Sequence, residues 1–387
     1  MAKGQKRINL ALQGGGAHGA FAWGVIDKII EDGRLSIEGI CATSAGTMNA
    51  CAYAYGHFTG GPERAREVLH DFWWNIHQAG QQYSPIQRMP WESFMPGNSW
   101  NMDQSPAFFA FDTMTRMFSP YQLNPFDFNP LRDVLKKTID FDMLQKCDCT
   151  KLFISTTHVR TGKVRVFNAD QMTLDVAMAS ACLPFLFKAV EVEGEDYWDG
   201  GYMGNPALFP LFYETEARDV MIVHINPIER EETPTTAPDI MNRINEISFN
   251  SSLLKEMRAI AFVKKLVEHG MIKDEHKDDF KDVLVHSVRA DEAMKELSVS
   301  SKFSSDWDFL LELKERGRNT MQNWLDENFD KVGEEDTVDL HGEFLYSVTK
   351  MFEGTKGKGH DHKHHESTKT SKTPAKKLKA KATLKTA

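Results

Sequence analysis

Short apolar runs and helix-spaced apolar stripes follow one another from the N-terminus of this chain. Residues 7–13 form an apolar run that predicts a buried strand. Residues 17–32 carry apolar side chains on or near one helical face, and Gly33 stands where that helix is expected to end. The apolar runs 40–42 and 220–225 predict further strands.

The same patterns recur through the middle of the chain and return beyond residue 239. Residues 239–269 predict a helix with six apolar residues at helix spacing, which are Ile240, Ile244, Ile247, Leu254, Met257 and Ala261. The other predicted elements are helices at 62–78, 131–138, 177–182 and 307–329 and strands at 152–157, 164–167 and 283–288.

A serine stands at the turn between the second predicted strand and a helix expected to begin at Ala45. On such a turn the Ser44 hydroxyl can face a ligand, while the backbone N–H of Ala45 points into the same space. This pattern is typical of a nucleophile elbow, although Ala42 occupies the position where glycine is usual. Alanine is tolerated there if its φ is negative. The alternative is a serine that only caps the helix.

A glycine-rich turn, Gly-Gly-Gly-Ala-His-Gly at residues 14–19, joins the first predicted strand to the first helix. Such a turn leaves N–H groups unpaired at a helix N-terminus, where partial positive charge gathers. It can therefore stabilise a phosphate or the oxyanion of a tetrahedral intermediate.

The spacing of Gly14, Gly16 and Gly19 also matches the dinucleotide-binding fingerprint. That fingerprint needs an acidic residue at the end of the second strand to hold the ribose hydroxyls. Glu38 precedes this strand, and Ser44 stands at its end, so the pattern favours an anion-binding loop beside a nucleophile. No Gly-Lys-Ser/Thr sequence follows the turn, which argues against a nucleotide-hydrolase phosphate loop.

A carboxylate candidate lies roughly 150 residues beyond the serine. Asp199 follows the strand-like pair Tyr197-Trp198 and precedes Gly200 and Gly201, which allow a tight backbone turn around an exposed acid. Taken alone, an Asp-Gly pair is more often an ordinary turn. Together the three turns supply an anion-binding loop, a nucleophile and a base, which acyl-ester hydrolysis requires.

Four motifs in this order resemble the patatin-like phospholipases. They are the glycine turn at 14–19, the Ser44 elbow, the stretch Ala-Met-Ala-Ser-Ala-Cys-Leu-Pro at 177–184, and Asp199-Gly200-Gly201. The resemblance spans about residues 7–226. It implies an α/β class with a three-layer α/β/α fold and a Ser-Asp dyad, without histidine, that hydrolyses acyl esters of lipids.

The resemblance also assigns roles to residues of this chain. It implies that Ser44 is the nucleophile, that Asp199 is the base, and that the N–H groups of Gly15, Gly16 and Ala45 form the oxyanion hole. No cofactor and no metal are implied. Ala42 and His18 depart from the family pattern, which usually has glycine and a basic Arg or Lys at these two positions. The supporting loop residues are Gly14, His18, Gly19, Gly46, Gly200 and Gly201.

Aspartate is a weak base at neutral pH, since its ordinary pKa is about 3.9. The dyad chemistry therefore requires Asp199 to be partly desolvated. A Ser-Asp-His triad would instead have to recruit His224 or His286. His224 lies inside the apolar run 220–225, where a core histidine is the simpler interpretation.

The segment 81–130 is rich in aromatic residues, methionines and prolines. Such a segment cannot form one long helix, and its apolar side chains are expected to cover something. We predict a lid-like, substrate-binding insertion over Ser44 at about residues 80–130. The alternative is a packing layer without substrate contact.

Three regions are expected along the chain. Residues 1–230 are predicted to form the hydrolase core, and 231–354 a helical extension that completes or caps it, with a possible amphipathic helix at 338–352. Residues 355–387 are lysine-rich and lack aromatic residues, which predicts a disordered tail. This basic tail is expected to be solvated or to touch an anionic membrane or a polymer-granule surface, and we expect no specific nucleic-acid partner.

Several sequence features bear on the cellular compartment in which this protein is expected to work. No apolar run is long enough to span a membrane, and no signal peptide is recognised. Five cysteines, an odd number in a long chain, argue against a disulfide framework, and Cys147-x-Cys149 lacks a second ligand cluster for zinc. A reducing cytoplasm fits these features best.

Three functions compete at this stage. The favoured one is a lipid acyl hydrolase of the phospholipase A type. The second is an intracellular depolymerase of polyhydroxyalkanoate polyester, suggested by the aromatic-methionine segment and the basic tail. The third is a catalytically silent lipid- or granule-binding regulator, suggested by Ala42 and His18. Sequence does not indicate the oligomeric state.

Overall fold

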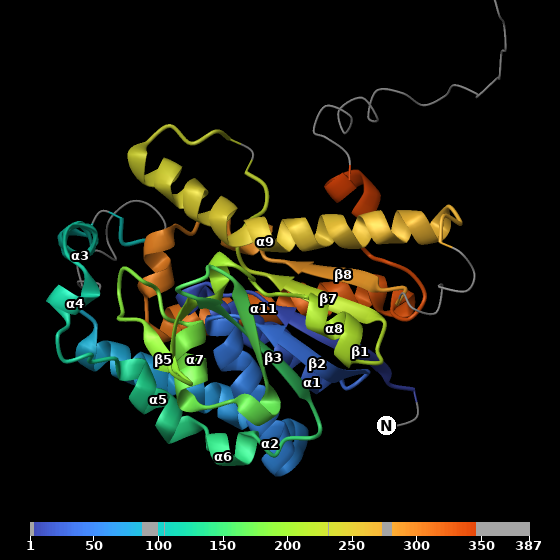
Figure 1. Ribbon diagram of the computed structural model, residues 1–387, viewed down its shortest axis with the longest axis horizontal. Coiled ribbons are helices and arrows are strands. Elements are labelled where there is room, and N and C mark those ends of the chain that lie inside the picture. The colour runs from blue at the N-terminus through green and yellow to red at the C-terminus, as the bar shows by residue number, and fades with distance from the viewer. Residues whose placement is uncertain (1–3, 87–99, 104, 231, 273–280, 346–387) are drawn as a thin grey trace, which may run out of the picture. The chain divides into compact units, whose positions relative to one another are not determined.

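A mixed eight-stranded sheet runs through the computed structural model (Figure 1). The structure describes residues 4–345 apart from 87–99, 104, 231 and 273–280. Seven strands lie in the order β5-β6-β3-β2-β1-β7-β8, and β4 pairs with β3. The strands are β1 (Lys6–Leu12), β2 (Leu35–Ala42), β3 (Lys151–His158), β4 (Val164–Asn168), β5 (Val190–Val192), β6 (Glu195–Asp199), β7 (Asp219–His224) and β8 (Leu284–Arg289).

The sheet combines a parallel centre with an antiparallel edge. Strand β1 pairs in parallel with both β2 and β7, whereas β6 pairs antiparallel with β3. The carboxyl ends of β1 and β2 therefore lie side by side at one edge of the sheet. This edge receives the glycine turn that follows β1 and the serine turn that follows β2.

Helices cover both faces of the sheet because the central strands are apolar on both sides. Leu10 and Leu12 of β1 belong to one core, and Ala11 between them belongs to the other. The larger core includes residues of α1, α2, α7 and α11, and the smaller one residues of α9. The three-layer α/β/α prediction is thus confirmed. The main helices are α1 (Gly19–Asp32), α2 (Ala45–Tyr83), α3 (Pro106–Met117), α5 (Pro130–Thr138), α7 (Leu174–Ser180), α9 (Ala237–Glu268) and α11 (Trp307–Asn328).

Helix α2 begins directly after Ser44 and includes the predicted helix 62–78. Its backbone leaves helical geometry at Gly60 and Gly61, immediately before Pro62. Proline is tolerated in the first turn of a helix but not in a helix interior. The long element is therefore two helices joined by a kink, and the first of them carries Ser44 at its N-terminus.

The segment between α2 and α5 is broken at prolines, as predicted. Helix α3 has a proline in its first turn, and so does the short α4 (Pro120–Leu123). No residue of α3 is buried. The predicted lid is not tested by these features, and part of it, 87–99 and 104, lies outside the described residues.

The C-terminal part adds to the same compact unit. Strand β8 extends the sheet beside β7, and α11 packs closely on α1. The proposed boundary near residue 230 stays a prediction. The predicted tail at 355–387 and residues 346–352 of the amphipathic stretch 338–352 lie outside the described residues. Among the described residues, no helix is both long and apolar enough to span a bilayer.

Candidate active site

Ser44 occupies the sharp turn between β2 and α2. Its backbone has φ 53° and ψ −123°, a combination that residues other than glycine rarely adopt. Strain of this kind is typical of a serine displayed on a strand-to-helix turn. Ala42, the last residue of β2, does not have positive φ. Alanine is therefore tolerated at this position of the nucleophile elbow, which requires a residue without positive φ.

The glycine turn after β1 packs directly against the serine turn. A Cβ atom added at Gly14 would lie 2.6 Å from Cβ of Ser44, and one added at Gly19 would lie 2.6 Å from Cβ of Ala45. At Gly46 an added Cβ would lie 2.4 Å from the carbonyl oxygen of Leu12. The two turns can approach this closely only because these positions lack side chains.

Three backbone donors predicted for the oxyanion hole are unoccupied. The N–H groups of Gly15, Gly16 and Ala45 have no hydrogen-bond acceptor among the residues that the structure describes. The N–H of Gly14 differs, because it donates to Oδ1 of Asn205 at 2.7 Å. Gly14 therefore shapes the loop, whereas the next two glycines keep donors available.

Asp199 ends β6 and is fully buried, so the expectation of an exposed acid at this turn is wrong. Its backbone N–H donates to the carbonyl of Cys182 at 2.7 Å, and its carboxylate Oδ1 accepts the N–H of Gly201 at 2.7 Å. A Cβ atom at Gly200 would lie 2.2 Å from the backbone oxygen of Ser155. Gly200 thus allows the turn to lie directly against β3, and Gly201 lies against Phe249 of α9.

The structure brings Ser44 and Asp199 together. Burial raises the pKa of Asp199 to about 7, while the Gly201 N–H and the Ser44 side chain lower it. The Ser44 side chain is thus near enough to the carboxyl group to affect its pKa, but Asp199 Oδ2 is buried without a hydrogen-bond partner among the described residues. Contacts of this kind often tighten when substrate binds. The carboxyl group has the desolvation that a base working near pH 7 requires.

His18 does not supply a cation beside the glycine turn. It is buried, and its Nε2 lies 2.8 Å from Oγ of Ser301. Burial, and then the positive charges of Lys302 and Arg316, hold the pKa of His18 well below 6.5. The imidazole is therefore neutral at pH 7, and this departure from the family pattern removes a charge from the turn.

The two histidines considered for a triad have other surroundings. Burial lowers the pKa of His224 to about 3, with a further contribution from Arg289. His286 Nε2 lies 2.8 Å from Oδ1 of Asp219, the first residue of β7. Neither histidine perturbs the pKa of Asp199. In the described part of the chain, no hydrogen bond joins either histidine to Asp199.

Ser180 is hydrogen-bonded both to the serine turn and to β3. The sequence alone did not indicate this role. Its Oγ accepts the backbone N–H of Ser44 at 3.0 Å and donates to the carbonyl of Ser155 at 2.9 Å. The same oxygen lies 2.8 Å from Oγ1 of Thr47. Ser180 belongs to the family stretch 177–184, which was the only signal in the sequence that could have pointed to it.

A lysine from a distant segment approaches the glycine turn. Lys302 Nζ donates to Oδ1 of Asn226 at 2.8 Å, and Nδ2 of Asn226 donates to the carbonyl of Gly14 at 2.8 Å. A Cβ atom at Gly16 would lie 2.5 Å from the backbone oxygen of Lys302. Burial lowers the pKa of this lysine to about 8, and the charge of Glu246 partly offsets that effect. No local pattern in the sequence indicated this residue.

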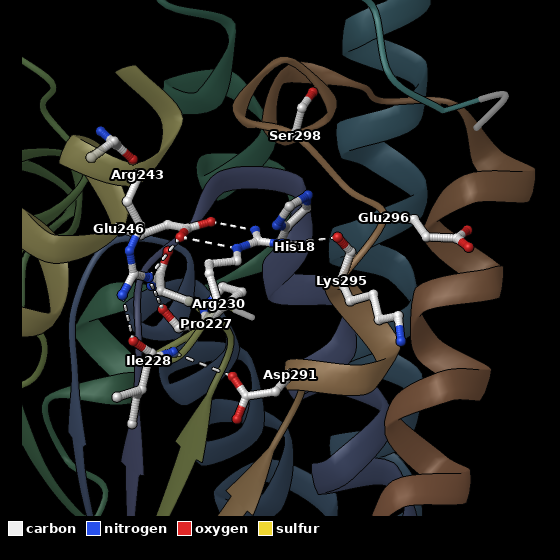
Figure 2. A network of polar contacts seen from close by, with 12 residues as sticks. His18, Pro227, Ile228, Arg230, Arg243, Glu246, Asp291, Lys295, Glu296 and Ser298 are labelled. Carbon is white, nitrogen blue, oxygen red and sulfur yellow. Dashed lines mark hydrogen bonds and ion pairs between the residues drawn. The ribbon is translucent and has the colours of Figure 1, made fainter. Parts of the chain in front are cut away.

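An ion network around Glu246 connects α9 to the loop that follows β7 (Figure 2). Glu246 of α9 is 5% exposed and pairs with both Arg230 and Arg243. Arg243 also donates to the carbonyl of Ile228 at 2.8 Å, and Arg230 donates to the carbonyl of Lys295 at 2.9 Å. One face of the first half of α9 is thereby tied to the loop that follows β7.

The sequence profile of the patatin-like phospholipases matches residues 10–212, which is more than half of the chain. The chain belongs to the patatin-like phospholipase family. Members of this family are lipid acyl hydrolases. The matched range contains the glycine turn, Ser44 and Asp199. No protein of curated function matches the chain in sequence.

A comparison of this patatin-like chain with solved structures found matches of low sequence identity. VipD from Legionella pneumophila is 14% identical, with 92% of this chain and 74% of VipD covered and a TM-score of 0.39. ExoU from Pseudomonas aeruginosa, solved with SpcU, is 13% identical, with 82% of this chain and 53% of ExoU covered and a TM-score of 0.27. The chain thus spans about half the length of ExoU.

Proposed function

We propose that this chain hydrolyses acyl esters of lipids as a phospholipase A, with Ser44 as nucleophile and Asp199 as base. The observation that carries the proposal is a buried carboxyl group whose pKa is raised to about 7, placed beside a serine with a strained backbone. A carboxylate with that pKa is a far stronger base than a solvated aspartate. Membership of a family of lipid acyl hydrolases supports the substrate class.

In the first half of the proposed reaction, Ser44 Oγ attacks the ester carbonyl carbon while Asp199 accepts the hydroxyl proton. Negative charge then develops on the carbonyl oxygen and is stabilised by the N–H groups of Gly15, Gly16 and Ala45. The tetrahedral intermediate breaks its bond to the leaving oxygen. The protonated Asp199 returns its proton to that oxygen, so a lysolipid alcohol leaves and an acyl-serine ester remains.

In the second half, water attacks the acyl-serine carbonyl and gives a proton to Asp199. The same donors stabilise the second oxyanion. The intermediate expels Ser44 Oγ, which takes the proton back from Asp199, and a fatty acid is released. At the end of the cycle the acyl group has left as fatty acid, Ser44 carries its proton again, and Asp199 is deprotonated.

The alternative of a silent regulator receives little support from the site. Ala42 is buried without positive φ, and the neutral His18 leaves the donors of the glycine turn free. Polyester remains an alternative substrate because its ester group would react by the same steps. Comparing phosphatidylcholine, a soluble monoacyl ester and amorphous polyhydroxyalkanoate as substrates separates the two activities.

The deciding experiment combines a fluorophosphonate probe with product analysis on phosphatidylcholine. The parent chain is expected to be labelled and to release fatty acid, whereas Ser44→Ala is expected to do neither. Asp199→Asn keeps the shape of the side chain but removes the base, and its turnover is expected to fall by about 10⁴-fold. Labelling of Ser44→Ala, or full turnover by Asp199→Asn with an unchanged melting temperature, would reject the proposed dyad.

A further inference from the structure

The first half of helix α9 presents an apolar stripe to solvent. Ile240, Ile244 and Ile247 are 41%, 51% and 53% exposed. Their spacing places them along one face of the helix, which normally packs against a core. In the second half of the same helix, Leu253 and Met257 lie in the smaller core.

The face of this half-helix that adjoins the isoleucine stripe is already anchored. Arg243 and Glu246 point into the buried ion network that joins α9 to the loop after β7 (Figure 2). Glu246 is 5% exposed, so separating it from its arginines would leave an uncompensated buried charge. These ion pairs therefore hold the isoleucines toward solvent. Rotating the helix about its axis to bury them would separate Glu246 from its arginines.

A second apolar segment is exposed between α2 and α5. Phe109 and Met117 of α3 are 71% and 70% exposed, and Phe126 after α4 is 93% exposed. Helix α3 buries none of its residues, although it is rich in phenylalanine and methionine. We refer to six residues together as the apolar rim, namely Phe109, Met117, Phe126, Ile240, Ile244 and Ile247.

Residues 302 and 303 connect the two helices that carry most of the apolar rim to the glycine turn. The ring of Phe303 lies 6.2 Å from that of Phe108 in α3. The preceding residue, Lys302, reaches Asn245 of α9 at 3.4 Å and supports the glycine turn through Asn226. In Figure 1, α3 and the first half of α9 both lie on the left, away from the N-terminus at the right.

We propose that the apolar rim docks this chain onto a phospholipid bilayer, so that its side chains enter the acyl-chain region beside Ser44. This inference rests on the proposed function and deepens it, because it names the physical state of the substrate. An ester at a bilayer surface must reach a nucleophile without its acyl chains crossing water. Apolar side chains next to that nucleophile lower the cost of this transfer.

The charges near the apolar rim favour a bilayer over a charged macromolecular partner. Arg116 of α3 pairs with Asp112 one turn earlier, and Arg243 of α9 pairs with the buried Glu246. The two arginines are therefore each neutralised by a carboxylate of their own helix. Binding through the apolar rim should therefore persist in high salt, whereas binding through the basic tail should not.

The test measures sedimentation of the full chain with vesicles, in a Ser44→Ala background that cannot consume the lipid. One set of vesicles is phosphatidylcholine alone, and the other also contains phosphatidylglycerol. The background chain is expected to bind both sets in low and in high salt. The triple change Phe126→Glu, Ile244→Glu and Ile247→Glu is expected to weaken binding by about tenfold or more, because charged side chains enter a bilayer poorly.

Phe262→Glu is the matched control. Phe262 lies on the second half of α9 and is 54% exposed, almost the same as Ile247 at 53%. This variant is expected to bind vesicles like the background chain. Melting temperatures of all variants establish that they are folded, since exposed substitutions away from special sites usually change stability little.

Several outcomes would overturn the docking proposal. These are no binding to either vesicle, binding that disappears in high salt, equal loss in Phe262→Glu, binding to polyester granules instead of vesicles, or a dimer that the triple change converts to a monomer. Hydrolysis of a soluble short-chain ester by the chain with Ser44 intact tests the proposed chemistry separately. Failure of docking and failure of catalysis are thus distinguishable.

Discussion

The hydroxyl oxygen of Ser180 accepts a hydrogen bond from the backbone N–H of Ser44 over 3.0 Å. It connects the last turn of α7 to a serine whose φ is 53°. Because the same hydroxyl donates to the carbonyl of Ser155 in β3, Ser180 fixes the serine turn relative to the sheet.

Ser180→Ala is expected to lower kcat by about tenfold to a hundredfold and stability by about 1–3 kcal/mol, because it leaves two backbone groups without their partner. The measurement is kcat and KM on a soluble ester, with denaturant unfolding. Thr47→Val removes only the contact between Thr47 and Ser180, so its kcat should change much less. Equal kcat losses in the two variants would contradict a specific role for the Ser44 contact.

The raised pKa of Asp199 leads to a prediction of how activity depends on pH. The base must be deprotonated, and its pKa is about 7, so kcat/KM should rise tenfold per pH unit below pH 7 and level off above it. A profile that levels off near pH 4 would show that Asp199 titrates like a solvated carboxyl group. Initial rates on a soluble ester between pH 4 and pH 9 decide this.

The same group predicts how stability depends on pH. The folded-state pKa of about 7 exceeds the ordinary value of 3.8, so the folded chain binds this proton more tightly than the unfolded chain. The stabilising contribution is full below pH 3.8 and is lost as the pH rises to about 7. Relative to the parent chain, Asp199→Asn should therefore gain about 2–4 kcal/mol between pH 4 and pH 8. Urea unfolding at both pH values measures this difference, and parallel pH dependences would contradict it.

Lys302 predicts an upper limit to the active pH range. Its ammonium supports the glycine turn through Asn226, and its pKa is lowered to about 8, so kcat should decline above that pH. Lys302→Arg should move the decline to higher pH because guanidinium stays charged. Lys302→Met should lower kcat about tenfold at pH 7.5.

Lys295→Met is the control for this charge effect, because Lys295 has a 56% exposed side chain and pairs with Glu292 at the surface. Its kcat and pH profile should match those of the parent chain. An unchanged upper limb in Lys302→Arg would assign the decline above pH 8 to another group. Thermal unfolding of each variant separates loss of charge from loss of fold.

Ala42→Gly tests the departure from the usual elbow sequence. Ala42 is fully buried and lacks positive φ, so glycine brings no conformational benefit there. We expect unchanged turnover and a loss of about 1 kcal/mol in stability, from greater freedom of the unfolded chain and a lost methyl group. A marked gain in kcat would show that the alanine restrains the nucleophile.

Much of the fold follows from local patterns. The strand at 7–13, the helix ended by Gly33 and the strand at 220–225 were predictable because periodicity and glycine conformation act over a few residues. The three chemically informative turns were visible for the same reason. Close packing of Gly14 and Gly46 against the chain explains why glycine occupies these positions.

Sequence by itself determined the elements, the family and the candidates Ser44 and Asp199. The tertiary structure decided that these two meet, that Asp199 is buried, and that Ser180 and Lys302 support the turns. It also decided that Ile244 faces solvent, which helix spacing alone could not indicate. Periodicity reports which side chains share a face, whereas burial, pKa and contacts between distant segments depend on what packs against that face.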